Sequence, residues 1–346
     1  MSLTNAQQTQ LLQLTQALFG AAPGATYLSI LGDSLNAGQT LANIAQTLTS
    51  ATLFFGKNYA ANLSPSQFAS SFINDLVGNR ASVADKAFAV TYITDKMAAG
   101  AGQADIITEL TQILSSIPSD HPNWGVAAAH YNTGLATKIV DNLIGNSASA
   151  ANKAAAIGYI VEQMAAGQSL GSLIDWAITV LDSVDHTDAN WGSAASLFDN
   201  RTEVAKYYSV DKAGNALDLG TLQQVLKTVT ADAGSVAAAK ALFDNPHRGV
   251  AQDGYIAGAT VTVKVPGQPD VVVTTDAQGN FTLPPGVFGT ITVTGGTDIS
   301  TNLPFTGTLT APAGSTTANP LTTLQQSFVD KGLSAAQAQD LGTSTK

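Results

Sequence analysis

Hydrophobic residues recur at helical spacing through most of the chain, from residue 3 to about residue 245. The segment from Phe68 to Val77 is typical, because its apolar residues fall three or four positions apart and so share one face of a helix. Ser64-Pro65 precedes this segment, and a capping serine followed by proline is a common helix start. Glycine and proline interrupt the pattern at short intervals, which predicts short helices joined by tight turns.

Part of this helical pattern is written twice, at a constant spacing of 67 residues. Gly78-Asn79 matches Gly145-Asn146, and Asn123-Trp124-Gly125 matches Asn190-Trp191-Gly192. Recurrence at one ungapped offset indicates a helical repeat protein, in which each unit buries its apolar face against its neighbours. We therefore expect an α-helical repeat domain over residues 1–245. Its parts are a diverged unit at 9–60, three-helix units at 64–130 and 131–197, and closing helices to residue 245.

Near residue 250 the pattern changes to an alternation rich in β-branched residues. Such runs cover 259–265, 271–275, 279–283 and 290–294, with turn residues between them. Strands of this length and spacing predict a small Ig-like β-sandwich over 250–312. The domain boundary is expected at 245–249, and a linker with a helical tail at 313–346. The predicted fold class is multidomain, α followed by β.

Composition narrows the classes of function. Of the 346 residues only 12% are charged, and 15 basic against 25 acidic residues give a net charge of −10. An acidic chain lacks the basic stripe of a nucleic-acid binder and the cluster of a polybasic membrane anchor. The absence of cysteine excludes disulfides, thiolate metal sites and a cysteine nucleophile.

The N-terminal sequence has no positive segment followed by an apolar one, so no Sec-type signal peptide is expected. No run of about 18 apolar residues is present, so no membrane span is expected. The chain is then cytosolic, trimmed, or exported by a route that reads another signal.

Three aspartates, Asp182, Asp185 and Asp188, follow the last helix of the second unit and could supply oxygen ligands to Ca²⁺. The alternative is a solvated helix end and turn. The first unit has Ser115, Pro118 and His121 at these positions, so the cluster is not part of the repeat.

No pattern of catalytic residues is recognisable. The four histidines are His121, His130, His186 and His247. None has the spacing of a known catalytic motif, although His186 beside Asp185 is conceivable as an acid–base pair. We expect loop or surface histidines and no enzyme.

Trp124 and Trp191 occupy the same position in the two units, after a polar loop. An aromatic face could stack against a sugar, but recurrence at a fixed position favours packing between helices. The preceding Asn123 and Asn190 are expected to cap the helices that follow.

Two stretches near the N-terminus, Leu18–Leu28 and Leu35–Ile44, resemble a family of helical repeats of uncharacterised function, the DUF4214-like class. These repeats are common at the N-termini of large secreted bacterial proteins, including S-layer and RTX-type surface proteins. Phe72–Leu114 and Ile139–Leu181 fit the same pattern.

The β segment resembles the modules that follow in such proteins. Asp253–Val261 and Thr274–Leu283 are similar to carboxypeptidase-regulatory-like or bacterial Ig-like domains, and Pro320–Leu324 recurs after them.

The resemblance implies a structural, S-layer-like protein of the cell surface. It would assemble with itself into a lattice, or anchor to cell-surface polysaccharide such as lipopolysaccharide through the helical domain. Ca²⁺ at the three aspartates is the expected cofactor. Proteins of this class commonly leave by type I secretion, which needs no N-terminal signal peptide, so an extracellular location is expected. Alternatives are a secreted adhesin or filament subunit, and a polysaccharide-binding accessory chain of a hydrolase or lyase.

Overall fold

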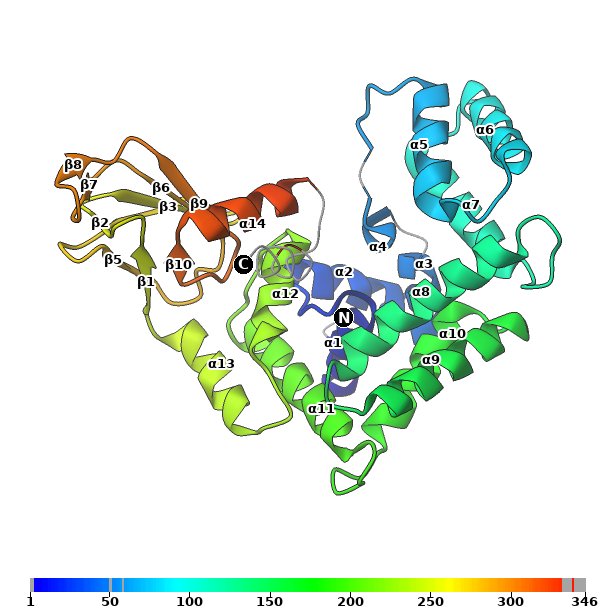
Figure 1. The fold of residues 1–346 in the computed structure, drawn as a ribbon. Helices are drawn as coiled ribbons and strands as arrows, with labels where there is room; N and C mark the ends of the chain where they lie inside the picture. Colours follow the sequence, from blue (N-terminus) through cyan, green and yellow to red (C-terminus); the bar gives the residue numbers. More distant parts are fainter. Residues whose placement is uncertain (1–2, 50–51, 58, 332–337, 339–346) are drawn as a thin grey trace. The chain divides into compact units, whose positions relative to one another are not determined.

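The computed structural model describes residues 3–49, 52–57, 59–331 and 338. The chain is mostly helical, and a small β region follows near the C-terminal end (Figure 1). The helices before the β region are α1 Asn5–Phe19, α2 Ala25–Asn36, α3 Leu41–Thr49, α4 Thr52–Phe55, α5 Pro65–Val77, α6 Val83–Ala98, α7 Gln103–Ser116, α8 Gly125–Ile144, α9 Ala150–Ala165, α10 Leu170–Asp182, α11 Gly192–Lys206, the π-helical segment η1 Tyr207–Asp211, α12 Leu219–Lys227 and α13 Gly234–Asp244.

The chain divides into two compact units. The first comprises Met1–Gly20 and Leu31–Phe198, and the second comprises Ala21–Ile30 and Asp199–Lys346. The division thus falls between Phe198 and Asp199, and the boundary expected at 245–249 lies inside the second unit.

Helix bounds in the first unit recur at the spacing of the sequence match. Helix α6 spans Val83–Ala98 and α9 spans Ala150–Ala165, 67 positions later at both ends. Helices α5 and α8 end before Gly78 and Gly145, whose φ angles are 54° and 50°. Glycine suits this backbone region because it lacks a Cβ. The start expected at Ser64-Pro65 is confirmed, since Ser64 and Gln67 form a capping box around Pro65.

The core of the first unit contains the apolar face expected over Phe68–Val77. Phe68 and Phe72 are fully buried and stack on each other with ring centroids 5.8 Å apart. Ile93 of α6 and Ile106 of α7 pack into the same cluster, so α5, α6 and α7 bury a common face. Ala127 and Ala128 of α8 also belong to this cluster.

The β region lies in the second unit. Its elements are β1 His247–Ala251, β2 Ile256–Ala257, β3 Thr260–Lys264, β4 Val271–Thr274, β5 Asn280–Leu283, β6 Thr290–Thr294, β7 Thr297–Asp298, β8 Leu303–Pro304, β9 Thr308–Ala311, β10 Thr317–Ala318 and the helix α14 Pro320–Asp330. Sheet orders are β4-β3-β6-β9, β10-β1-β5 and β2-β7-β8. The four expected runs correspond to β3, β4, β5 and β6.

Alternation explains how these strands share a core. In β3, Val261 and Val263 are buried while Thr260 and Lys264 are exposed. They pack with Phe281 of β5, which belongs to another sheet. Strand β1 was not expected, because it covers residues assigned to the link. The helical tail is present as α14, whereas 332–337 and 339–346 of its expected range, with Leu333 among them, lie outside the described residues.

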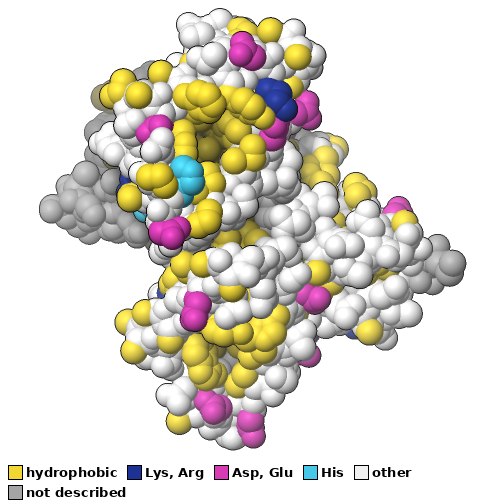
Figure 2. Space-filling model, turned by 90° about the vertical axis from the view of Figure 1, so that its right-hand side faces the viewer, with side chains coloured by type: hydrophobic (Ala, Val, Ile, Leu, Met, Phe, Trp, Pro, Cys, Tyr) yellow, Lys and Arg dark blue, Asp and Glu magenta, His cyan; other side chains and the backbone are white. Residues whose placement is uncertain are grey.

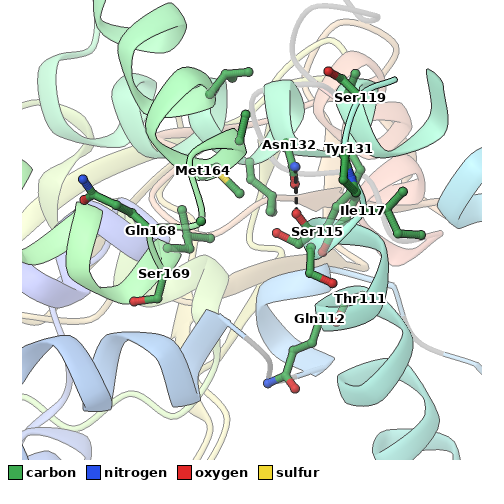
Figure 3. Close-up of a pocket in the computed structure, with 18 of the residues that line it drawn as sticks. Thr111, Gln112, Ser115, Ile117, Ser119, Tyr131, Asn132, Met164, Gln168 and Ser169 are labelled. Atoms are coloured by element: carbon green, nitrogen blue, oxygen red, sulfur yellow. Dashed lines mark hydrogen bonds between the residues drawn. The ribbon is translucent and has the colours of Figure 1, made fainter. Parts of the chain in front are cut away.

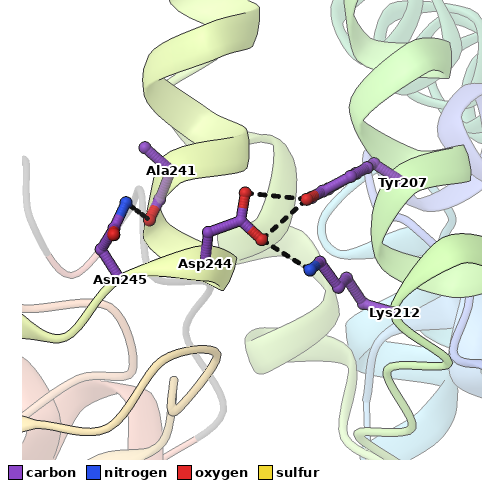
Figure 4. Close-up of polar contacts among 5 residues, drawn as sticks. All are labelled: Tyr207, Lys212, Ala241, Asp244 and Asn245. Carbon is purple, nitrogen blue, oxygen red and sulfur yellow. Dashed lines mark hydrogen bonds and ion pairs between the residues drawn. The ribbon is translucent and has the colours of Figure 1, made fainter.

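The end of α13, just before the expected link, contacts both the preceding helical segment and the β region. Asp244, at the end of α13, accepts hydrogen bonds from the Tyr207 hydroxyl at 2.7 and 2.8 Å (Figure 4). Its carboxylate also lies 2.6 Å from Lys212 Nζ, and Lys212 with Tyr207 lowers the pKa of Asp244. The preceding residue, Phe243, packs against Phe288 of the β region, with ring centroids 5.2 Å apart. Helix α13 is therefore tied to both η1 and the β region.

The His247 imidazole is expected to make this junction sensitive to acid. It stacks on Phe288 at 5.2 Å, and burial lowers its pKa below the ordinary 6.5, against the opposing effect of a hydrogen bond with the Val287 backbone. Below pH 6.5 the unfolded chain binds more protons than the folded chain, so stability falls as pH drops towards the folded pKa. Thermal unfolding between pH 7.5 and 5 should show this loss, and His247→Phe should reduce it. His130→Gln, at an exposed histidine, is the control; an equal acid loss in His247→Phe would contradict the assignment.

Candidate functional site

The three aspartates proposed for calcium each have a separate partner. Asp182 Oδ1 accepts a hydrogen bond from Gln13 Nε2 at 2.8 Å. Asp185 Oδ1 accepts from the backbone N–H and hydroxyl of Thr187, and these bonds lower the pKa of Asp185. In the described ranges, no group of three or more histidine, aspartate or glutamate side chains is arranged to hold a metal ion. The calcium site stays a prediction.

Asp188 and His121 lie at equivalent positions of the two repeat units and accept hydrogen bonds from equivalent backbone N–H groups. Asp188 Oδ1 accepts from the N–H groups of Asn190 and Trp191 at 2.8 Å. His121 Nδ1 accepts from the N–H groups of Asn123 and Trp124 at 3.2 Å. Both side chains satisfy backbone donors where a helix begins, although one is a carboxylate and the other an imidazole.

The capping role expected for Asn123 is wrong. No side chain caps α8 at Trp124, and the Asn123 amide donates to Asp85 Oδ1 at 2.9 Å. Asn190 accepts through its backbone oxygen from Asn152. These asparagines join the loop to the preceding α6 or α9 helix.

His121→Asp is expected to stabilise the first unit by about 0.5–1 kcal/mol, because a carboxylate is the stronger acceptor and favours a helix N-terminus. Asp188→Ala is expected to destabilise it by about 1 kcal/mol. Urea unfolding of each variant measures both changes. If His121→Asp were destabilising, the two side chains would not be equivalent acceptors for these backbone N–H groups.

The tryptophans Trp124 and Trp191 are both partly buried. Trp124 packs against the core cluster of α5–α8. Tyr159 and Trp176 form a more exposed aromatic pair that was not predicted as a site. They are 40% and 42% exposed, and their ring centroids lie 4.7 Å apart. The first unit has Glu109 in place of Trp176, bonded to Tyr92 and Lys96.

A pocket of about 510 Å³ lies in the first of the two compact units, between α7, the loop after it, α8, α9 and α3 (Figure 3). This volume is in the range of small-molecule sites. Its lining combines hydroxyl, amide and apolar side chains: Gln46, Thr49, Thr111, Gln112, Ser115, Ser116, Ile117, Pro118, Ser119, Ala129, Tyr131, Asn132, Leu135, Val161, Met164, Ala165, Gly167, Gln168, Ser169 and Leu170.

None of the lining residues described carries a charge. Tyr131 is the one phenol among them; burial raises its pKa to about 12, against a hydrogen bond with Thr111, so it stays protonated at neutral pH. The Asn132 side chain donates through Nδ2 to the Ser115 carbonyl at 2.9 Å. Its Oδ1 is buried and has no hydrogen-bond partner among the described residues. The pocket can bind an uncharged polar molecule, and its lining offers no acid–base pair.

Two polar residues of this pocket have apolar counterparts 67 positions later. Thr111 and Tyr131 correspond at the 67-residue spacing to Ile178 and Phe198, both buried. Comparison of the units therefore contained the signal. This signal consisted of single hydroxyl groups at core positions, whereas the candidates predicted from sequence were aspartates, histidines and tryptophans. The differing stretch Ser115–His121 does contribute, since residues 115–119 line the pocket.

A second feature of the first unit is an exposed apolar face on α6. Val83 is 83% exposed and Phe88 is 72% exposed, and Ala84 and Ala87 beside them are also exposed. Figure 2 shows hydrophobic side chains gathered in two areas of one side of the molecule, with charged groups scattered around them; the upper area lies at the level of α5–α7.

Comparison of the chain with known protein families, with curated proteins and with solved structures finds no match in any of the three. The resemblance to S-layer and RTX-type proteins therefore stays a prediction. Among the helices that the structure describes, none is both long and apolar enough to cross a membrane.

Proposed function

We propose that this chain is a non-enzymatic structural protein of the cell surface that assembles with copies of itself. The observation that carries the proposal is the exposed apolar face of α6, which consists of Val83, Ala84, Ala87 and Phe88. Burying one phenylalanine or valine side chain is favourable by about 1.5–3 kcal/mol. A face with two such side chains in water is typical of an interaction surface.

Helix α9 offers a complementary surface. At the positions equivalent to Val83 and Phe88 it has Ala150 and Ala155, and Ala154 and Ala155 are exposed. A Cβ added at Gly158 would meet nothing within 4 Å, so the space beside this helix is open. Large side chains on α6 and small ones on α9 allow the two faces of neighbouring molecules to interlock.

Contact between two different faces is head-to-tail, so a bound pair still has one α6 face and one α9 face free. Such contacts form rings or open polymers. The low charge of the surface favours this, because few ions lose their hydration at the contact. We infer that the three-helix units are structural repeats that hold α6 and α9 at a fixed separation, and that the β region is an Ig-like sandwich.

The remaining parts of the proposal extend to location and ligands. The chain is exported to the cell surface, where its helical part also attaches to envelope polysaccharide, with Ca²⁺ at Asp182, Asp185 and Asp188 promoting assembly. The uncharged pocket supports polysaccharide attachment, because sugars present hydroxyl groups and apolar ring faces together.

A second candidate function is an adhesin or filament subunit that adds a strand from another chain. It is favoured by β4, which pairs with β3 alone in its sheet and has Val272 60% exposed. An exposed edge strand can pair with an incoming strand.

Electron microscopy and light scattering of the purified protein, with and without Ca²⁺, test the proposal. Lattices or polymers are expected. A protein that is monomeric in every condition and does not sediment with envelope polysaccharide would refute it. Filaments that persist after loss of the α6 face and disappear on Val272→Lys would favour strand addition.

A further inference from the structure

The pocket of the first unit contains a buried polar group that packing alone does not require. Asn132 is 7% exposed, and its Oδ1 has no hydrogen-bond partner among the described residues. An unpaired buried acceptor costs about 1–3 kcal/mol. Asn132 Nδ2 is held by the Ser115 carbonyl, so the amide cannot turn to relieve Oδ1 without breaking that bond.

The same scaffold tolerates apolar side chains beside Asn132. The residues 67 positions after Thr111 and Tyr131 are Ile178 and Phe198, which are 3% and 0% exposed. Thr111 and Tyr131 therefore carry hydroxyl groups at positions whose counterparts 67 residues later are hydrocarbon. Both hydroxyl-bearing residues and Asn132 line one cavity (Figure 3).

We propose that this pocket binds one uncharged pyranose sugar. Thr111, Tyr131 and Asn132 form the polar side that receives its hydroxyl groups, and Leu135, Val161 and Met164 form the apolar side for the ring face. Because no described lining residue is charged, a phosphate, carboxylate or ammonium group would lose its hydration without a partner ion. The inference deepens the proposed function, on which the assignment of the sugar to a surface polysaccharide rests.

Saturation-transfer NMR with the full chain tests the site. The probes are glucose, mannose, galactose, rhamnose and N-acetylglucosamine, with glucuronic acid and glucose 6-phosphate as charged counterparts. We expect at least one uncharged sugar to bind with a Kd of about 1 mM, typical of a small ligand with few atoms. We expect both charged sugars to bind at least tenfold more weakly.

Two variants, Thr111→Ile and Tyr131→Phe, introduce the residues found 67 positions later. Each is expected to weaken sugar binding at least tenfold while thermal unfolding is unchanged. Tyr159→Phe and Thr179→Ile make the same chemical changes at exposed positions outside the pocket and are expected to bind normally. If Thr111→Ile fails to fold, the near-isosteric Tyr131→Phe still decides the result.

The inference is overturned if no uncharged sugar binds, if a charged sugar binds better, or if both pocket variants bind like the wild type. Its failure can be told apart from that of the proposed function. Sedimentation with whole envelope polysaccharide that both variants retain would refute the pocket alone, whereas loss of assembly through α6 leaves sugar binding by the monomer unaffected.

Discussion

Replacing Val83 and Phe88 by serine is expected to abolish assembly and leave a folded monomer. Both side chains are largely exposed, at 83% and 72%, so their removal costs little in the isolated molecule. In the head-to-tail contact each would be buried, and their loss removes about 3–6 kcal/mol per contact, a hundredfold or more in affinity. Light scattering and electron microscopy measure the change. Val126→Ser, at a 68% exposed valine on α8, is the matched control and should assemble normally.

A mixing experiment tests the direction of the contact. Ala155→Trp fills the α9 surface with a large side chain while its own α6 face stays intact. Neither this variant nor Val83→Ser/Phe88→Ser should polymerise alone. In a mixture, Ala155→Trp supplies an α6 face and Val83→Ser/Phe88→Ser supplies an α9 face, so the two variants should form a discrete heterodimer. Polymers in either variant alone, or no heterodimer in the mixture, would contradict the α6–α9 contact.

Lys138→Met is expected to stabilise the protein at neutral pH. Lys138 of α8 is partly buried; its Nζ donates to the Phe54 carbonyl at 2.6 Å and lies 4.1 Å from the Phe54 ring centroid. No carboxylate in the described part of the chain pairs with it, and burial lowers its pKa from 10.5 to about 8. This depression corresponds to roughly 3 kcal/mol, and the lost bond to Phe54 returns about 1 kcal/mol. The net gain is about 2 kcal/mol.

The pH dependence isolates this effect. Between pH 8 and 10.5 the unfolded lysine binds a proton that the folded lysine has lost, so wild-type stability rises with pH across this window. Below pH 8 the full cost is present. Urea unfolding of the wild type minus that of Lys138→Met should show the rise. Lys57→Met, at an exposed ion pair with Asp75, should change stability by less than about 1 kcal/mol. Parallel curves for wild type and Lys138→Met would show that the ammonium is not destabilised.

Helix starts were predictable because they depend on neighbours in sequence. A serine side chain reaches the N–H three residues ahead, as Ser64 and Ser82 do, whatever the rest of the chain does. The strands β3 to β6 were predictable for the same reason, since alternation places successive side chains on opposite faces. The short strands β2, β7, β8 and β10 were not, because two residues carry no detectable pattern.

The candidate site was less predictable. Charged residues were the first candidates for a site, but Asp182 bonds to Gln13, a residue 169 positions away, and Asp188 accepts from backbone N–H groups just before α11. Similarly, His121 and Asp188 looked like a difference between the units until both were seen to accept from the same backbone groups. Side chains of different chemistry can accept from the same backbone N–H groups, and the residue types in the sequence do not show this.

The sequence by itself determined the helical periodicity, the match at 67 residues, the alternating strands and the scarcity of charge. These are properties of residues close together along the chain or of the composition. Only the tertiary structure brought Thr111 of α7, Asn132 of α8 and Met164 of α9 into one cavity and left Phe88 in water. Such contacts join residues far apart in sequence, and they depend on how whole helices pack, which no local pattern encodes.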